Sequence, residues 1–229
     1  MSNDFIPTVI YVTTPEHTVK VWNDFVVKFK NDRYLISQDH DLIVNFVNPL
    51  LENEFIIQEQ KVLSRARINN SLPYERFDND ELGSPPADKA SPGRFNPKAV
   101  PYLYMANDVE TAVSEVLPFI SAKVDVAKCT ILNEKKLWDL TKEVNNHDTG
   151  FRALLTKEFS RPINPYRAET DYMPTQYIAE YCKGKGFDGV KYQSVCNPSG
   201  YNICLFNSED VDISYNKTVT VNKICVNYK

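Results

Sequence analysis

The sequence predicts an α+β domain, with short strands and amphipathic helices mixed along one chain of 229 residues. Two patterns indicate this fold class. Short segments rich in β-branched and aromatic residues recur between Pro, Gly and Asn residues, as in strands, and other segments repeat apolar residues every three or four positions, as in helices. The predicted strands are residues 5–12, 62–68, 100–106, 123–132, 187–192, 201–206 and parts of the tail 211–228. The predicted helices start near residues 14–16, 107–108, 151 and 171.

The composition is that of an ordinary soluble globular protein, with 42% apolar and 24% charged residues. The net charge is −4 and no long run of Lys or Arg occurs, which disfavours direct nucleic-acid binding because that requires a basic face. No window of 18 apolar residues exists, and the N-terminus lacks a basic region followed by an apolar run. We therefore expect a cytoplasmic protein with neither a membrane span nor a secretory signal.

The five cysteines and three histidines show no CxxC pair and no spacing typical of metal ligands. We expect reduced thiols and no metal site.

The first helix starts at Thr14-Pro15-Glu16, where a hydroxyl cap precedes a proline at the first helical position and an acid in the first turn. Apolar residues continue through residues 39–47 and end at Pro49. Residues 1–60 are therefore predicted to form a mostly helical extension packed on a main domain of residues 61–229. The expected apolar face of the first helix carries Val19, Trp22, Phe25, Val26 and Phe29.

Arg65 and Arg67 lie two residues apart in the strand predicted over residues 62–68, so both side chains project from the same face. Solvated charges at a sheet edge explain such a pair, and an anionic ligand would suit it equally. The next segment, residues 69–91, is a polar, turn-rich loop of about 20 residues, a length typical of functional or mobile loops.

Residues 91–115 form one compact unit that carries three candidate site residues. The turn Ser91-Pro92-Gly93 is followed at once by Arg94. The strand 100–106 carries Tyr104, and Asn107 and Asp108 offer a helix cap, with Glu110 placed as in a capping box. Glu115 lies on the polar flank of that helix. The expected buried stripe of the helix is Val109, Ala112, Val113, Val116, Leu117 and Ile120.

A second loop, residues 193–200, begins with Ser194 after the strand 187–192 and returns into the strand that carries Asn202. Ser194 has no GxSxG context, which disfavours serine hydrolase chemistry. Neither GxGxxG nor GxxxxGK[ST] occurs, so a nucleotide would have to be bound by side chains.

Four segments, in this order, resemble the RES domain: LSRARI, SPGRFNPKAVPYLYMANDVETAVSEV, TQYIAEYCKGKGFDGVKYQSV and GYNICLF. This family is named for its Arg, Glu and Ser and includes the toxins of RES–Xre toxin–antitoxin pairs. The resemblance covers about residues 62–210. It implies mixed, largely antiparallel sheets with flanking helices, similar to the ADP-ribosyltransferase toxin fold, and an enzyme that consumes NAD by hydrolysis or phosphorolysis.

Carried over position by position, the resemblance places the family's functional residues on Arg65, Arg94, Tyr104, Glu115 and Ser194. Guanidinium groups bind phosphate oxygens in pairs, so the two arginines are expected to hold the pyrophosphate. Cleavage of the nicotinamide–ribose bond develops oxocarbenium character, which a carboxylate such as Glu115 would stabilise. Ser194 would bind a ligand hydroxyl or phosphate, or position Glu115.

Three further residues, Phe95, Arg67 and Asn202, complete the expected substrate site. Tyr104 and Phe95 offer flat surfaces for stacking. Arg67 matches the family less securely, and Asn202 is a neighbour in the closing strand. No cofactor beyond NAD as substrate is expected, with inorganic phosphate as an optional co-substrate.

The acceptor of ADP-ribose stays open between water, phosphate and a protein side chain, the last of which would make the protein an ADP-ribosyltransferase. The family resemblance implies a growth-inhibiting toxin or defence effector, with a cognate Xre-like antitoxin that blocks the site. A protein of a different class, which keeps the fold and binds a nucleotide or a partner without turnover, is the alternative to an enzyme.

Overall fold

The computed structural model describes residues 15–32, 37, 40–52, 54–141, 150–160 and 167–224, so the strand expected over residues 5–12 lies outside the described residues. The strands are β1 (Glu54–Ile57), β2 (Val62–Asn69), β3 (Leu103–Ala106), β4 (Lys123–Ile131), β5 (Lys135–Asp139), β6 (Gly189–Gln193), β7 (Tyr201–Leu205) and β8 (Val211–Thr220). The α-helices are α1 (Pro15–Asp32), α2 (Asn48–Leu50), α3 (Val109–Glu115), α4 (Phe151–Ser160), α5 (Ala168–Asp171) and α6 (Met173–Gly184). A π-helical turn, η2 (Ile43–Val47), precedes α2, and a 3-10 turn, η3 (Ala87–Lys89), lies in the long loop.

The strands form one sheet in the order β1-β5-β6-β7-β3-β2-β4-β8. β5 and β6 pair in parallel, and the other six neighbouring pairs described are antiparallel. The predicted fold class, α+β with a mixed, largely antiparallel sheet and flanking helices, is confirmed. β8 lies at the sheet edge, as the β-branched tail predicts.

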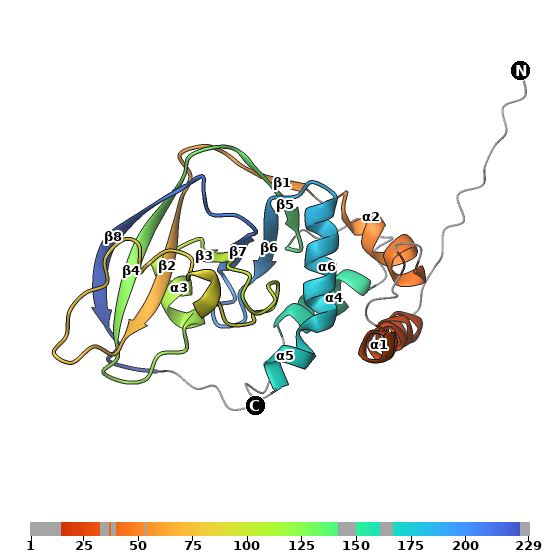
Figure 1. Ribbon diagram of the computed structural model, residues 1–229, viewed down its shortest axis with the longest axis horizontal. Helices are drawn as coiled ribbons and strands as arrows, with labels where there is room; N and C mark the ends of the chain where they lie inside the picture. Colours follow the sequence, from red (N-terminus) through yellow and green to blue (C-terminus); the bar gives the residue numbers. More distant parts are fainter. Residues whose placement is uncertain are drawn as a thin grey trace, which may run out of the picture.

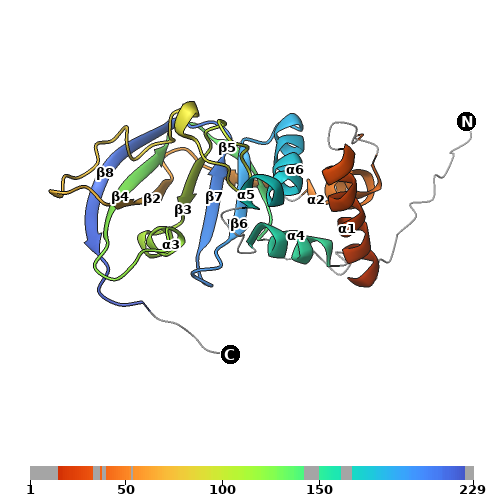
Figure 2. The same cartoon turned by 60° about the horizontal axis from the view of Figure 1, so that its bottom comes forward.

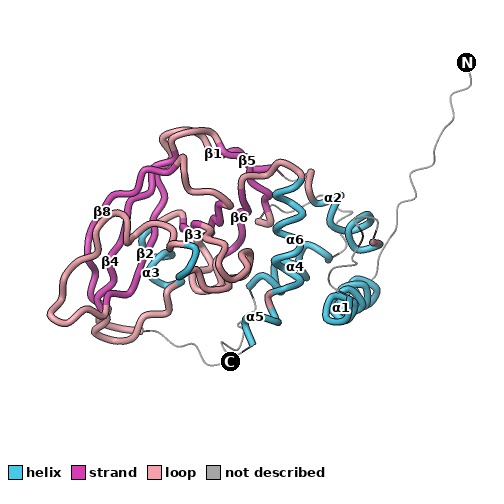
Figure 3. Tube along the Cα trace, viewed as in Figure 1, coloured by secondary structure: helices cyan, strands magenta, loops and turns pink. Residues whose placement is uncertain are grey.

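Most helices gather at one end of the sheet, and α3 lies apart from them. Figures 1 and 2 show α4 and α6 beside β6, α1 and α5 against those two helices rather than against the sheet, and α3 against β2, β3 and β7. The same division between helices and strands is visible in Figure 3. The cluster that packs α3 on the sheet contains only Ala and Val among its buried members, and such small side chains allow the helix to approach the strands closely. These are Ala66, Ala106, Ala112, Ala122, Val124 and Val126.

The segment before Lys61 contributes both helices and a strand. α1 begins at Pro15, as its start signal predicts. Its buried face differs from the predicted one, because Val19 is exposed whereas Val21 is buried beside Trp22, Phe25 and Phe29. β1 pairs with β5 and forms the other edge of the sheet.

The α3 helix is shorter than its apolar pattern predicts. It ends at Glu115, and Leu117 has a positive φ of 48°, a backbone conformation that cannot continue a right-handed helix. Leu117 and Ile120, expected in the buried stripe, are therefore 77% and 60% exposed. At the other end, Asp108 is the cap, and its side chain accepts a hydrogen bond from the Thr111 amide.

The long loop after β2 is anchored to the sheet by a buried carboxylate, Asp125 on β4. Asp125 accepts hydrogen bonds from Asn69 Nδ2 at 2.7 Å, Tyr74 Oη at 2.7 Å, the Phe77 amide at 3.0 Å and Thr218 Oγ1 at 2.5 Å. Burial alone would raise the pKa of Asp125, but these hydrogen bonds outweigh burial and lower the pKa below its ordinary value. The Asp125 carboxylate thus connects residues 69–77, at the start of the loop, to β4 and β8.

Candidate functional site

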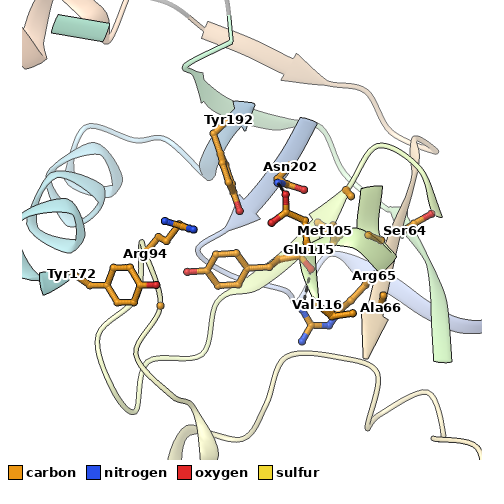
Figure 4. Close-up of a pocket in the computed structure, with 14 residues that line it drawn as sticks. Ser64, Arg65, Ala66, Arg94, Met105, Glu115, Val116, Tyr172, Tyr192 and Asn202 are labelled. Atoms are coloured by element: carbon orange, nitrogen blue, oxygen red, sulfur yellow. Dashed lines mark hydrogen bonds between the residues drawn. The ribbon is translucent and has the colours of Figure 1, made fainter. Parts of the chain in front are cut away.

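A pocket of about 330 Å³ opens where β2, β3, β6 and β7 meet α3 and the turn at Gly93. Figure 4 shows Arg94 and Tyr172 on one side of the view, and Glu115, Asn202 and Arg65 on the other. The volume is within the range of small-molecule sites. The pocket is lined by Ser64, Arg65, Ala66, Gly93, Arg94, Tyr104, Met105, Ala106, Ala112, Glu115, Val116, Tyr172, Tyr192 and Asn202.

Five of the eight predicted site residues line this pocket although they come from distant segments: Arg65, Arg94, Tyr104, Glu115 and Asn202. The remaining three, Ser194, Arg67 and Phe95, do not line it.

The Glu115 carboxylate is held at one of its two oxygens. Its Oε1 accepts hydrogen bonds from Ser194 Oγ at 2.6 Å and from Asn202 Nδ2 at 2.7 Å. In the part of the chain that the structure describes, Oε2 accepts none. The two donors therefore fix the carboxylate and leave its second oxygen for a ligand. Of the roles considered for Ser194, this geometry supports the positioning of Glu115.

The loop that carries Ser194 is docked on α3. The Asn197 side chain donates from Nδ2 to Thr111 Oγ1 at 2.9 Å, and the backbone N–H of Asn197 donates to Ser194 Oγ at 3.0 Å. A Cβ atom at Gly200 would lie 2.1 Å from Thr111 Oγ1, so only glycine allows this approach. Helix α3 thus supplies Glu115 and also holds the loop that orients it.

Arg65 is fixed by the main chain on both sides of its guanidinium group. Nε donates to the Leu82 carbonyl and Nη1 to the Tyr104 carbonyl, both at 2.9 Å. Burial lowers the pKa of Arg65, but an arginine stays charged at any physiological pH. A guanidinium has five N–H donors, so these two bonds do not exhaust its capacity to bind an anion.

Arg67, also predicted to bind substrate, has a different environment from the residues that line the pocket. It is exposed, its Nη1 donates to the Glu81 carbonyl at 2.6 Å, and its guanidinium lies 4.4 Å from the centre of the Phe77 ring. Its contacts are with the long loop, and it is absent from the pocket lining. Arg67 therefore holds the loop against β2.

Tyr104 joins the strand side of the pocket to the turn that carries Arg94. Its hydroxyl donates to Asn96 Oδ1 at 2.7 Å and accepts from the Phe95 amide at 3.2 Å. A Cβ atom at Gly93 would lie 2.3 Å from Asn96 Oδ1 and 2.7 Å from the Tyr104 hydroxyl, which explains the glycine. Burial raises the pKa of Tyr104 well above its ordinary value, so the hydroxyl stays a neutral donor.

Phe95 does not offer the stacking surface expected from the sequence. Its side chain is fully buried in the helical core and packs on Phe159, with ring centroids 4.8 Å apart. A ring in that position cannot contact a ligand in the pocket, and the stacking role assigned to it is corrected.

Two tyrosines that the sequence reading missed also line the pocket. Tyr192, on β6, is 7% exposed, and its hydroxyl points between Arg94 and Glu115 in Figure 4. Burial, Cys204 and Glu115 raise its pKa, which Arg94 partly offsets, so Tyr192 is a neutral hydrogen-bond donor. Its position on β6, two residues before the predicted site residue Ser194, could have indicated that it lies near the site. Tyr172, just before α6, carried no such signal.

The described residues contain no group of three or more His, Cys, Asp or Glu side chains placed to hold a metal ion. Among the same residues, no helix is both long and apolar enough to cross a membrane. The charged and phenolic side chains that line the pocket are those of two arginines, three tyrosines and one glutamate.

A comparison with family models matches residues 66–223 to the RES domain, and the match begins directly after Arg65. A search of curated proteins found no match. Among solved structures, the chain is similar to one in the crystal structure of the M. tuberculosis MbcT-MbcA toxin-antitoxin complex, with a TM-score of 0.42 and 12% identity over 77% of this chain and 91% of that chain. Because the family match spans most of the chain, this protein belongs to the RES domain family.

Proposed function

We propose that the protein degrades NAD by cleaving the bond between nicotinamide and ribose. The observation that carries this proposal is the convergence of Arg65, Arg94 and Glu115, from three separate segments, on one pocket. Two guanidinium groups suit a pyrophosphate, which carries two negative charges and presents its oxygens in pairs. Membership of the RES family supports the same reading, since NAD consumption is expected of its members.

The carboxylate supplies the chemical step. Loss of nicotinamide leaves oxocarbenium character on the ribose, and a fixed negative charge stabilises this transition state more than the ground state. Glu115 is already oriented through Oε1, so its Oε2 needs no rearrangement when the charge develops. Nicotinamide departs as a neutral molecule, and its departure requires no general acid.

The tyrosines complete the proposed substrate site. The half-buried Tyr104 lines the pocket with its hydroxyl against the turn of residues 93–96, where its ring can pack against the ribose or the nicotinamide ring. Tyr192 presents a neutral hydroxyl beside Glu115 and Arg94, suited to a ribose hydroxyl or a phosphate oxygen.

We propose further that this activity makes the protein a growth-inhibiting toxin, neutralised by a cognate Xre-like antitoxin that covers the pocket. Residues 61–229 would form the catalytic domain, and residues 1–60 an extension packed on it. The acceptor would be water or phosphate, with transfer to a protein as the second possibility.

The direct test is release of nicotinamide from NAD by the purified protein, followed by chromatography. Glu115→Ala should reduce the rate by at least about a hundredfold, because it removes a transition-state contact. Glu110→Ala, an exposed position on the same helix, is the matched control and should be as active as wild type. Unchanged circular dichroism would show that both variants fold.

The products identify the acceptor. Free ADP-ribose indicates water, a phosphorylated ADP-ribose that appears only with added phosphate indicates phosphorolysis, and label retained on protein indicates transfer. Binding of NAD without nicotinamide release under any of these conditions would contradict an enzyme and favour a non-catalytic binding protein.

A further inference from the structure

The turn that carries Arg94 is held from behind by two adjacent residues of α6. Gln176 Nε2 donates to the carbonyls of Gly93 and Asn96, each at 2.8 Å, and thereby uses both of its N–H groups. Thr175 Oγ1 lies 2.8 Å from the Arg94 carbonyl and 2.9 Å from the Tyr172 carbonyl, and its one proton is shared between these two acceptors. Three carbonyls of one short turn therefore accept hydrogen bonds from one helix.

Both donors are buried, which makes their bonds costly to replace with water. Thr175 is 4% exposed and Gln176 is 7% exposed. The turn also closes on itself, since the Gly93 amide donates to the Asn96 carbonyl at 2.9 Å. A buried carbonyl that loses its donor is destabilised, so these bonds define one conformation for the turn.

Helix α6 is in turn fixed by the helices near the N-terminus. Tyr177, the residue after Gln176, packs against Phe25 and Phe29 of α1 with ring centroids 5.9 and 5.4 Å apart. One turn further along, Tyr181 Oη donates to Asn48 Oδ1 at 2.7 Å. The donors of the turn thus sit on a helix whose other face is packed, which prevents α6 from shifting away from the turn.

We propose that Gln176, assisted by Thr175, is a positioning residue that sets the place of the Arg94 guanidinium in the pocket. Neither side chain lines the pocket, so both act through the main chain of residues 93–96. This inference rests on the proposed function, because it takes the Arg94 guanidinium to bind the pyrophosphate of NAD. A misplaced guanidinium loses a bidentate contact, since a shift of about 1 Å is enough to disturb it.

The test measures the affinity for ADP-ribose by calorimetry together with the KM and kcat for NAD. Gln176→Leu removes both donors, and Gln176→Glu keeps the shape but replaces them with a carboxylate that faces carbonyl oxygens. Each should weaken ADP-ribose binding and raise KM by about tenfold or more, with a smaller change in kcat. Thr175→Val, which removes one donor at nearly constant volume, should weaken ADP-ribose binding and raise KM by a few fold. It keeps the inference testable if the Gln176 variants do not fold.

Tyr181→Phe is the matched control, since it removes a hydrogen bond of the same helix on the side away from the turn. It should lower the melting temperature without changing the affinity for ADP-ribose. Arg94→Ala combined with Gln176→Leu should bind no more weakly than Arg94→Ala alone, because both changes remove the same contact.

Wild-type affinity in Gln176→Leu, or additive losses in the double variant, would overturn the inference while the proposed function stands. A wild-type protein that neither binds ADP-ribose nor releases nicotinamide would instead overturn the proposed function, and the inference with it.

Discussion

The two sides of the pocket are held in different ways. On the sheet side, which comprises Arg65, Glu115 and Asn202, hydrogen bonds reach the side chains that line the pocket. On the helix side, which is the turn of residues 93–96 with α6 behind it, the hydrogen bonds from α6 reach main-chain carbonyls. On the sheet side the hydrogen bonds fix the Arg65 and Glu115 side chains directly. On the helix side they fix the main chain from which the Arg94 side chain extends.

This difference suits two tasks. Groups that stabilise a transition state gain most when they need no reorganisation, which favours direct fixation of the Glu115 carboxylate. In the proposed function, Arg94 binds the pyrophosphate, and hydrogen bonds to the main chain of the turn give that side chain a fixed point of attachment. We therefore expect substitutions on the sheet side to lower both the free energy of unfolding and the activity. A substitution of Arg94 on the helix side should lower mainly the activity.

The largest expected effect compares Arg65→Leu with Arg94→Leu. Arg65→Leu leaves the Leu82 and Tyr104 carbonyls without their donor and should lower the free energy of unfolding by about 2 kcal/mol. Arg94→Leu keeps every hydrogen bond between the main chain of the turn and α6, so it should lower the free energy of unfolding by less than Arg65→Leu does. Both variants should lose at least about tenfold in kcat/KM for NAD.

Urea denaturation and nicotinamide release, measured on the same preparations, check this pair of variants. Equal losses of stability in the two variants would show that the two sides of the pocket are not held differently.

A smaller effect is expected from the two donors to Glu115. Ser194→Ala and Asn202→Leu each remove one hydrogen bond to Oε1. A hydrogen bond to a charged group contributes about 1.5–3 kcal/mol, so kcat should fall by about tenfold or more in each variant. The KM for NAD should change little, because both residues act through the carboxylate. A raised KM at constant kcat would instead assign Asn202 to direct substrate binding, as the sequence suggested.

The sequence could predict a residue's place in the pocket when the pattern of its own short segment indicated it. It could not do so when that place depended on packing against a distant segment. Arg65, Arg94, Tyr104 and Glu115, which line the pocket, each stand in a short segment that resembles the family, and the strands around them follow from local apolar patterns. Phe95 was misread because its neighbour Arg94 lines the pocket, and no local pattern reveals that its ring packs on Phe159 instead.

Long-range contacts were beyond the sequence for the same reason. Gln176 lies 80 residues from Asn96, and only the packing of α6 brings its amide group to the turn. The exposure of Leu117 was hidden as well, because the apolar spacing continues beyond the point where the backbone leaves the helix.

The smallest expected effect is a change in acid stability that concerns the sheet side. The loop anchored by Asp125 also contains Leu82, whose carbonyl holds Arg65. Because the hydrogen bonds lower the pKa of Asp125 despite its burial, its ionised form stabilises the fold at every pH above the unfolded pKa of about 3.9. This contribution is lost as the pH falls through the folded pKa.

Asp125→Asn should therefore have a lower free energy of unfolding than wild type at pH 7. This difference in the free energy of unfolding should become smaller as the pH is lowered toward 3. Asp80→Asn, which changes an exposed carboxyl of the same loop, is the matched control. Narrowing is expected because, below the unfolded pKa of about 3.9, the unfolded wild-type chain takes up a proton at Asp125 that the folded protein, with its lowered pKa, resists, whereas the asparagine variant has no proton to take up at that position. If the difference in the free energy of unfolding between the two proteins stayed constant from pH 7 to pH 3, Asp125 would stabilise the loop by its shape alone. The negative charge of Asp125 would then not contribute to the stability of the sheet side.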